Sequence, residues 1–392
     1  MYQQKANKTV NGKKTSAKGA AMSSSHTKIK KESMDLGFLV SVMLLVVIGL
    51  IMVFSASYPT AYYETGNGFS VIQKQFLWAI LGVVAMLFTS NFNYNKYKKL
   101  AGVILGGCVL LLVAVLVIGN EVNGAKRWIG FGGASFQPSE AAKIGIIIYL
   151  AYSMSNIKGK IKEFKYLVRY AVVLGGFMLL LLLEPHFSVC IIIGLTAVIM
   201  MLVAGARIRY FALASVPVAV AGVAIAVFEP YRMQRLTTFV DPFKDRLGAG
   251  WQIIQSLYAI GSGGLFGVGF GNSRQKFMYV SEPQNDFIFA IVCEELGLIG
   301  ALAILALFGF MIYRGIKIAM NAPDTFSCLL VAGIVSLVAV QAVLNIAVVT
   351  SSIPTTGIPL PFFSAGGSSL VFLMAAMGIV LNVSKYKRQP KA

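Results

Sequence analysis

Long apolar runs separated by short polar segments make up most of the sequence after residue 35. A helix needs about 20 mostly apolar residues to cross the hydrocarbon core of a bilayer, and the runs predict about ten such helices, although several runs are shorter than that. The predicted spans are 36–57, 75–90, 100–119, 140–155, 168–183, 187–206, 210–228, 286–313, 326–350 and 366–383. This pattern predicts an all-α, polytopic membrane protein.

The polar segments predict one membrane domain with a basic tail at each end. Residues 1–35 are rich in Lys, Ser, Asn and Gly, and such a composition cannot bury enough apolar surface to fold. We therefore expect a disordered tail there, a membrane domain over 36–383 and a second basic tail over 384–392. The segment 229–285 is predicted to be a large loop between the seventh and eighth spans. Loops longer than about 15 residues are usually functional or disordered, and the aromatic residues of this loop predict that it folds against the membrane surface.

The composition excludes a soluble domain. Of the 392 residues, 57% are hydrophobic and 12% are charged, and the mean hydropathy is +0.75. A soluble domain has about 25% charged residues. The 4 cysteines stand singly in apolar runs and there are 2 histidines, so the sequence predicts neither a disulfide framework nor a zinc or histidine-based metal site.

The distribution of positive charge predicts the orientation in the membrane. Of the 34 lysines and arginines, 24 fall in the segments on the same side as the two termini. Cytoplasmic loops carry such an excess, so both termini are predicted to be cytoplasmic. The net charge of +19 then reflects orientation and contact with anionic lipid headgroups, and no nucleic-acid partner is expected. Polar chemistry is expected on the outer face, where most of the acidic residues lie.

The segment 122–143, VNGAKRWIGFGGASFQPSEAAK, is the first candidate for chemistry. It reads as an amphipathic interfacial segment with Trp128 as an anchor, followed by a helix start at a proline. Glu140 and Lys143 are spaced i, i+3 and share one helix face. Two interpretations stay open: a mutual ion pair, or a pair that lines a wet cavity in which Lys143 holds a phosphate.

The segment 250–277 is rich in glycine but does not predict a nucleotide site. It holds neither a G-x-x-x-x-G-K-[ST] motif nor a G-x-G-x-x-G motif after a strand, so helix packing or backbone flexibility explains the glycines more simply. Its first part, QIIQSLYAIG, is typical of an amphipathic interfacial helix. Arg274 and Lys276 follow and are candidates for binding an anionic headgroup.

The segment 281–297, SEPQNDFIFAIVCEELG, places three carboxylates in apolar surroundings, where acids are costly. Asp286 is either an ordinary helix cap or a functional acid at the aqueous rim. In a continuous helix, Glu294 and Glu295 would lie about 12–14 Å further along the axis, which excludes a paired-carboxylate glycosidase geometry. We interpret these two as buried groups that support the cavity, with a cation from another span as partner. Residues 286–293 belong either to a continuous eighth span or to a short segment that dips in from outside.

The segment 355–370, TTGIPLPFFSAGGSSL, cannot form a regular helix because of Pro359 and Pro361. Irregular backbone at membrane depth is tolerated only where it is buried in protein or lines a cavity. The alternatives are a plain external turn before the last span, or a cavity wall whose hydroxyls, Ser368 among them, contact a polar substrate.

Taken in order, these motifs resemble the SEDS family (shape, elongation, division and sporulation). The matching stretches are NGAKRWI, QPSEAAK, GWQIIQSLYAIGSGGLFGVGFGNSRQK, EPQNDFIFAIVCEELG and TGIPLPFFSAGGSS. The resemblance covers about residues 36–383 and leaves only the basic N-terminal tail outside. Within the family, the sequence is more similar to the FtsW and SpoVE branch than to the RodA branch.

This resemblance implies a ten-span glycosyltransferase of the bacterial cytoplasmic membrane that polymerises lipid II, with a class B penicillin-binding protein as crosslinking partner. Other division or sporulation membrane proteins are implied as further partners, and the choice between septation and sporulation stays open. The essential aspartate of the family matches Asp286, and its cavity residues match Arg127, Trp128, Glu140 and Lys143. The family also implies a divalent cation, Mg or Mn, although the sequence indicates no metal site. No nucleotide is expected.

Two positions depart from the pattern of the family. The frequent Q-P-D-F-G-T appears as residues 184–189, EPHFSV, so that His186 replaces the aspartate and no carboxylate role is assigned there. In the last loop Ala365 stands where a tyrosine is frequent.

The chemistry that the family implies is compatible with these residues. A diphosphate leaving group needs cations to stabilise its developing charge, and Lys143, Arg127 and Lys276 are the candidates. An acceptor hydroxyl needs a general base, for which Asp286 is the candidate, with its pKa raised by apolar surroundings. Two alternatives remain: a flippase for the lipid-linked precursor, and a non-catalytic division or sporulation scaffold.

Overall fold

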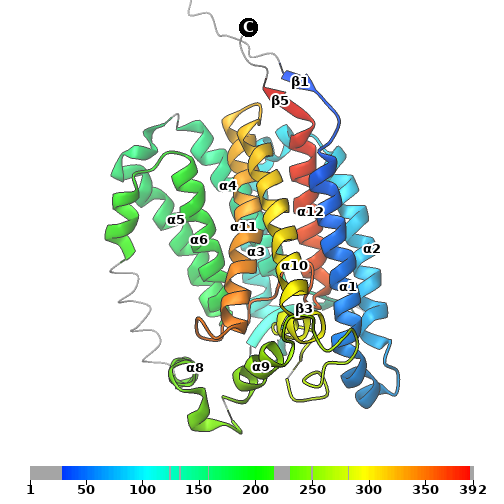
Figure 1. The fold of residues 1–392 in the computed structure, drawn as a ribbon. Coiled ribbons are helices and arrows are strands. Elements are labelled where there is room, and N and C mark those ends of the chain that lie inside the picture. Colours follow the sequence, from blue (N-terminus) through cyan, green and yellow to red (C-terminus); the bar gives the residue numbers. More distant parts are fainter. Residues whose placement is uncertain are drawn as a thin grey trace, which may run out of the picture.

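The computed structural model describes residues 29–122, 125–131, 134–157, 159–215, 230–248, 250–280 and 282–388. These residues form a bundle of long helices, with the N- and C-terminal strands together at one end of the bundle (Figure 1). The long helices are α1 (Leu36–Thr65), α2 (Ser70–Asn91), α3 (Tyr94–Ile118), α4 (Pro138–Asn156), α5 (Phe164–Leu183), α6 (Phe187–Val203), α10 (Ile288–Met320), α11 (Thr325–Val349) and α12 (Gly367–Ser384).

The helices agree with the predicted spans where the structure describes them. Within the described residues, 7 helices are long and apolar enough to cross a membrane, and α6 is a shorter apolar helix. Each predicted span except 210–228 coincides with one of the long helices. Residues 208–215 are helical, and the rest of that predicted span lies outside the described residues.

Helices α11 and α12 form the centre of the bundle. In their most apolar windows 61% and 72% of the residues are buried, compared with 22% in α2 and in α3. The start of α11 is fixed by a capping box in which Asp324 and Ser327 exchange hydrogen bonds. The central helices therefore present side chains to other helices, whereas the outer helices present apolar side chains to lipid.

At the end opposite the termini lie the short helices α8 (Pro230–Val240) and α9 (Trp251–Ser262) (Figure 1). Helix α9 confirms the amphipathic helix predicted from QIIQSLYAIG. Both belong to the predicted large loop 229–285, which is therefore partly helical in its described residues.

The prediction of an all-α fold is wrong in detail, because two small antiparallel sheets are present. At one end, β1 (Ile29–Lys31) pairs with β5 (Tyr386–Arg388), so the predicted disordered tail 1–35 contains a strand. At the other end, β2 (Asn120–Val122), β3 (Ala125–Phe131) and β4 (Ala134–Phe136) form a three-stranded sheet. The sequence predicts an interfacial loop here, because the pairing of the short strands depends on their cross-strand contacts.

Helix α10 is broken near its start. Gly297 has φ 67° and ψ −170°, which is not helical, and only glycine adopts this region readily. The break separates a short segment, Ile288–Leu296, from the long span that follows. The interpretation of a short separate segment is thus confirmed and that of a continuous helix is wrong, whereas its entry from the outer side stays a prediction.

The glycine-rich loop after α9 packs its backbone against this break. Val268 N donates to Glu294 O at 2.9 Å, and Leu298 N donates to Gly264 O at 2.9 Å. A Cβ on Gly267 would lie 2.1 Å from Glu295 O, and Gly267 has φ +80°. Close backbone approach is therefore the reason for the glycines, as the sequence reading favoured over a phosphate loop.

Candidate active site

A cavity of about 240 Å³ lies at the end of the bundle that carries β3 and α9. Its walls come from β3, the first turns of α4 and α6, the middle of α11, the loop 357–366 and the start of α12. Its polar lining consists mainly of charged, amide, hydroxyl and imidazole side chains: Arg127, Gln137, Glu140, Lys143, His186, Ser188, Asn285, Asp286, Gln341, Ser364 and Ser369. The cavity thus joins segments that lie far apart in the sequence.

Five predicted site residues line this one cavity: Arg127, Trp128, Glu140, Lys143 and Asp286. The loop 355–370 also lines it, which confirms the interpretation of this segment as a cavity wall. Because β3, α4 and the turn before α10 meet here, the structure brings together the residues that the sequence had only placed on the same side of the membrane.

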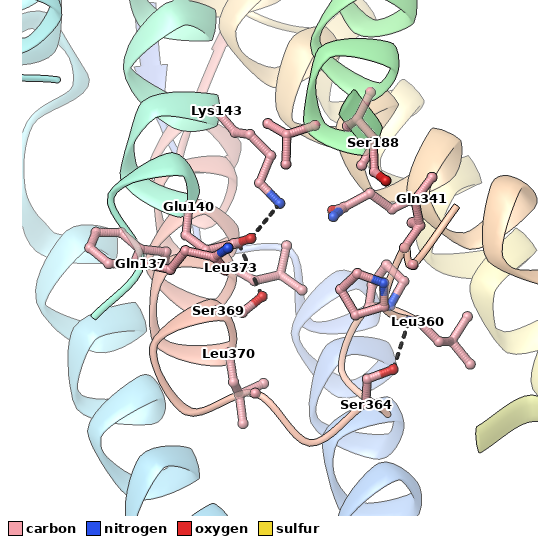
Figure 2. Close-up of a pocket in the computed structure, with 18 of the residues that line it drawn as sticks. Gln137, Glu140, Lys143, Ser188, Gln341, Leu360, Ser364, Ser369, Leu370 and Leu373 are labelled. Atoms are coloured by element: carbon pink, nitrogen blue, oxygen red, sulfur yellow. Dashed lines mark hydrogen bonds and ion pairs between the residues drawn. The ribbon is translucent and has the colours of Figure 1, made fainter. Parts of the chain in front are cut away.

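Glu140 and Lys143 form an ion pair at the start of α4. Lys143 Nζ lies 2.9 Å from a Glu140 carboxylate oxygen, and both side chains are buried. Ser369 Oγ donates to the other oxygen of Glu140 at 3.0 Å (Figure 2). The residues therefore pair with each other and also line the cavity, whereas the binding of a phosphate by Lys143 stays a prediction. The pairing holds Lys143 in place while its remaining N–H groups stay available.

Asp286 lies in the turn that precedes α10, where a side chain of α11 holds its backbone by a hydrogen bond. Asn345 Nδ2 donates to Asp286 O at 2.7 Å and to Ile358 O at 2.8 Å. The N-cap of α10 is Phe287, and no side chain caps it. The helix-cap interpretation of Asp286 is therefore wrong, and its carboxylate faces the cavity.

The surroundings of Asp286 make it a weaker acid. Burial, followed by the nearby negative charge of Glu282, raises its pKa to about 6, and the positive charge of Arg235 opposes this shift. Arg235 comes from α8 and its Nη1 donates to Thr355 O at 2.8 Å. An aspartate with this pKa is ionised at neutral pH and is basic enough to accept a proton.

Arg127 is oriented by the turn between α5 and α6. Its Nε donates to Glu184 O at 3.2 Å and its Nη2 donates to Pro185 O at 2.6 Å. Burial raises the pKa of the Glu184 carboxyl to about 8, with Arg127 opposing. Because burial favours the neutral form of this carboxyl, it offsets less of the positive charge of Arg127.

His186 lines the cavity as a neutral group. Burial, then Arg127 and Lys143, lower its pKa to about 3. Its Nε2 lies 3.5 Å from Gln137 Nε2. The departure from the family pattern therefore replaces a potential negative charge by an uncharged imidazole.

Lys276 does not belong to the cavity, so its predicted role toward an anionic headgroup is wrong. The side chain is 3% exposed, and Nζ contacts Glu295 Oε1 at 2.8 Å, Ser55 Oγ at 3.1 Å and Gly271 O at 2.6 Å. These groups saturate the ammonium, which instead joins α1, the glycine-rich loop and α10.

Glu294 and Glu295 are buried and hydrogen-bonded, as predicted. Glu294 accepts from Ser273 Oγ and, at 2.9 Å, from Arg274 N. The partner of Glu295 is Lys276, a cation from the outer loop and not from another span. The loop folds back into the bundle, which a linear reading of spans does not anticipate.

Ser368 also lies outside the cavity lining. Its Oγ accepts from Gln137 N at 3.4 Å, whereas the neighbouring Ser369 lines the cavity. Because α12 begins at Gly367, consecutive side chains point about 100° apart, and only the second serine faces inward.

Gln341, Ser369 and Arg235 are among the residues in or near the cavity that the sequence did not single out. Gln341 had a signal, because it and Asn345 are the two side-chain amides in the apolar run 326–350. Arg235 had none, since its approach to Asp286 depends on how α8 folds over the cavity.

The described residues do not form a metal site on their own. No group of three or more His, Cys, Asp and Glu side chains among them is arranged to hold a metal ion. In the cavity, Glu140 is already engaged by Lys143 and Ser369. The expected divalent cation stays a prediction, because a site made of one or two carboxylates and substrate phosphates needs no such group.

The fold and the cavity define a multi-pass protein of the cytoplasmic membrane with a charged site at one end of its helix bundle. Residues 36–389 match the family of cell cycle proteins that comprises FtsW, RodA and SpoVE. The chain belongs to this family, which confirms the resemblance seen in its motifs.

Curated relatives match over nearly their whole length. Stage V sporulation protein E of Bacillus subtilis (strain 168) is 44% identical over 363 residues, which are 92% of this chain and 99% of the relative. A probable peptidoglycan glycosyltransferase FtsW of Geobacter sp. (strain M18) is 39% identical, over 91% of this chain and 98% of the relative.

Solved structures share the fold. A chain from a structure described as "Structural coordination of polymerization and crosslinking by a peptidoglycan synthase complex" matches with TM-score 0.73 and 29% identity, covering 90% of this chain and 97% of its own. The rod shape determining protein RodA of Thermus thermophilus matches with TM-score 0.67 and 26% identity, covering 90% of this chain and 96% of its own.

Proposed function

We propose that the chain is a peptidoglycan glycosyltransferase that polymerises lipid II into glycan strands, with Asp286 as general base. The observation that carries the proposal is one cavity lined by an aspartate of raised pKa together with the cations Arg127 and Lys143. The names of the FtsW relatives and the synthase complex that shares the fold support the same activity.

The bonds and protons of this reaction follow from the residues in the cavity. An acceptor sugar hydroxyl attacks the anomeric carbon of the donor sugar while the Asp286 carboxylate takes the hydroxyl proton. The bond from that carbon to the lipid diphosphate breaks, and its electron pair leaves with the diphosphate oxygen. Arg127 and Lys143 stabilise the charge that develops there. A divalent cation, which proteins often hold through one or two carboxylates and substrate phosphates, would add to this stabilisation when bound.

The proposal includes a topology of ten spans, with both termini cytoplasmic and the loop 229–285 outside. The excess of lysine and arginine on the terminal side supports it. The cavity lies at the end opposite β1 and β5 (Figure 1). In this orientation the cavity opens where lipid II is presented on the outer face of the membrane.

We further propose a class B penicillin-binding protein as the partner. The synthase structure that shares the fold links polymerization and crosslinking in its description. A strand released from this cavity needs a transpeptidase to become part of a wall. The relative from B. subtilis favours a sporulation role, and the FtsW relatives favour division, so other proteins of either assembly are further partners.

The test uses the purified full chain in lipid nanodiscs with lipid II, with and without the partner transpeptidase. We expect glycan strands from the unaltered protein and a loss of at least about 100-fold in Asp286→Asn, in line with the 10²–10⁴-fold worth of a general base. Asp241→Asn is the matched control, because Asp241 is an exposed acid that caps a short helix in the outer loop.

Two other results would point elsewhere. Equal polymer from the Asp286→Asn protein and its control would refute the base assignment. Transport of the lipid across liposomes without polymer would favour a flippase, and an assembly defect in cells with neither activity in vitro would favour a scaffold.

A further inference from the structure

Gln341 is a buried amide that no protein group satisfies. Its side chain is 4% exposed, and in the part of the chain that the structure describes its amide makes no hydrogen bond. It extends from α11 into the cavity, toward the space that Lys143 enters from the opposite wall (Figure 2). Its amide atoms are accessible from the cavity and are not sealed in protein, so they are placed to hydrogen-bond to whatever occupies the cavity.

A second glutamine shows what a structural amide looks like in this protein. Gln75 is also 4% exposed, but its Nε2 donates to Ser364 O at 3.5 Å and its Oε1 accepts from Gly366 N at 3.2 Å. Both ends of that amide are used to tie α2 to the loop before α12. Gln341 has no such task.

The position of Gln341 is set by its neighbours on α11. Asn345, Gln341 and Leu337 follow one another at intervals of four residues and so share one helix face. Asn345 binds the backbone of Asp286 at 2.7 Å, and Leu337 lines the cavity as an apolar side chain. Gln341 therefore lies one turn from the segment that carries the base, on the side away from the rim.

The chemistry of the amide indicates what it binds. A charged diphosphate is best met by Arg127 and Lys143, whereas an uncharged amide offers one acceptor oxygen and two donor N–H groups. An acetamido group presents the complementary N–H and C=O. The sugar that is joined to the diphosphate carries such a group. This sugar also contains the anomeric carbon that the acceptor hydroxyl attacks.

We propose that Gln341 is a specificity residue that binds the acetamido group of the diphosphate-linked sugar through paired hydrogen bonds. This inference rests on the proposed function and names the part of the substrate that the amide reads. It makes the cavity selective for N-acetylated sugars independently of the charge of the diphosphate.

The test is equilibrium binding to nanodiscs of two probes: lipid II, and an analogue with a hydroxyl in place of the acetamido group on that sugar. Asp286→Asn is the background, so that no turnover occurs. With Gln341 present we expect roughly 10–100-fold tighter binding of lipid II than of the analogue, as for a site that hydrogen-bonds its substrate. In Gln341→Met, which keeps the side-chain length, we expect the preference to fall below about 3-fold, because methionine lacks both hydrogen-bonding ends.

Gln75→Met is the matched control, with the same chemical change at the same burial, and it should keep the preference. A preference retained by Gln341→Met would overturn the inference. Equal weakening of both lipids in that variant would also overturn it, because Gln341 would then contact a group that both share. Failure of the Gln341-containing protein to bind either lipid would instead refute the proposed function, and the inference with it.

Discussion

At the scale of single residues, the surroundings of Asp286 fit the role of general base that we propose for it. Asp286 is held by its backbone, through Asn345, and its carboxylate is left for chemistry. Two charges of opposite sign act on its pKa: Glu282 raises it and Arg235 lowers it. The basicity of the proposed base is therefore set by burial and by two charged neighbours.

This balance predicts the pH dependence of polymerisation. Only the ionised form of Asp286 accepts a proton, so the rate should fall about tenfold per pH unit below its pKa of about 6 and level off above it. Glu282→Gln removes a negative neighbour and should move the midpoint to lower pH. Arg235→Met removes a positive one and should move it to higher pH. Initial rates of lipid II polymerisation from pH 4.5 to about 8 measure both shifts; shifts in the same direction, or none, would contradict the assignment.

At the scale of elements, the break in α10 separates the short segment that follows Asp286 from the long helix. The short segment Ile288–Leu296 ends at Gly297, and a buried ion pair between Lys276 and Glu295 ties the glycine-rich loop to it. Ser55 of α1 donates to the same carboxylate at 2.7 Å. The segment that follows Asp286 is thereby anchored to two other parts of the chain.

Removing one partner of this ion pair should be costly. Lys276→Met leaves the Glu295 carboxylate buried without its cation, a change worth about 3–5 kcal/mol, and the double variant with Glu295→Gln should recover much of the loss. The thermal unfolding midpoint of the purified protein measures both. Lys387→Met is the control, since its pair with Glu32 is partly exposed and should contribute about 1 kcal/mol or less. Equal losses for the buried and exposed pairs would show that the network does not anchor the loop.

The sequence predicted the helices well and their interruptions poorly. Apolar length locates a span because the bilayer requires it, and this held for every predicted span in the described residues. The break at Gly297 and the inward fold of Lys276 depend on contacts between distant segments, which local pattern does not contain. The motifs identified five of the cavity residues. They did not distinguish Ser368 from Ser369, because the side of a helix on which a residue lies depends on the packing of that helix.

At the scale of the whole molecule, the two ends of the bundle differ in kind. One end carries the strand pair β1–β5 and the ion pair of Asp35 with Arg314 at 2.7 Å. The other carries the cavity, α8 and α9. The proposed orientation places the first end in the cytoplasm and the second outside.

Single cysteines test this orientation. In a background without the 4 native cysteines, a membrane-impermeant maleimide applied to intact cells should label Leu247→Cys, because Leu247 is 87% exposed at the cavity end. Lys162→Cys, on the exposed turn between α4 and α5, should react only after permeabilisation. The reverse order of labelling would invert the topology.

The contact between the glycine-rich loop and the break in α10 also limits how this protein can diverge. At Gly267 and Gly297 a Cβ would fall 2.1 Å and 2.3 Å from backbone atoms, and φ is positive at both. Every other coded amino acid has a Cβ, which would clash with the backbone there, so any substitution of these two glycines displaces the backbone. No such clash applies at the cavity wall, where a side chain can be exchanged while the backbone stays in place. His186 and Ala365, the two departures from the family pattern, are both of this second kind. Substitution can therefore change the side chains that line the cavity, whereas the contact between the glycine-rich loop and the break in α10 tolerates only glycine at these two positions.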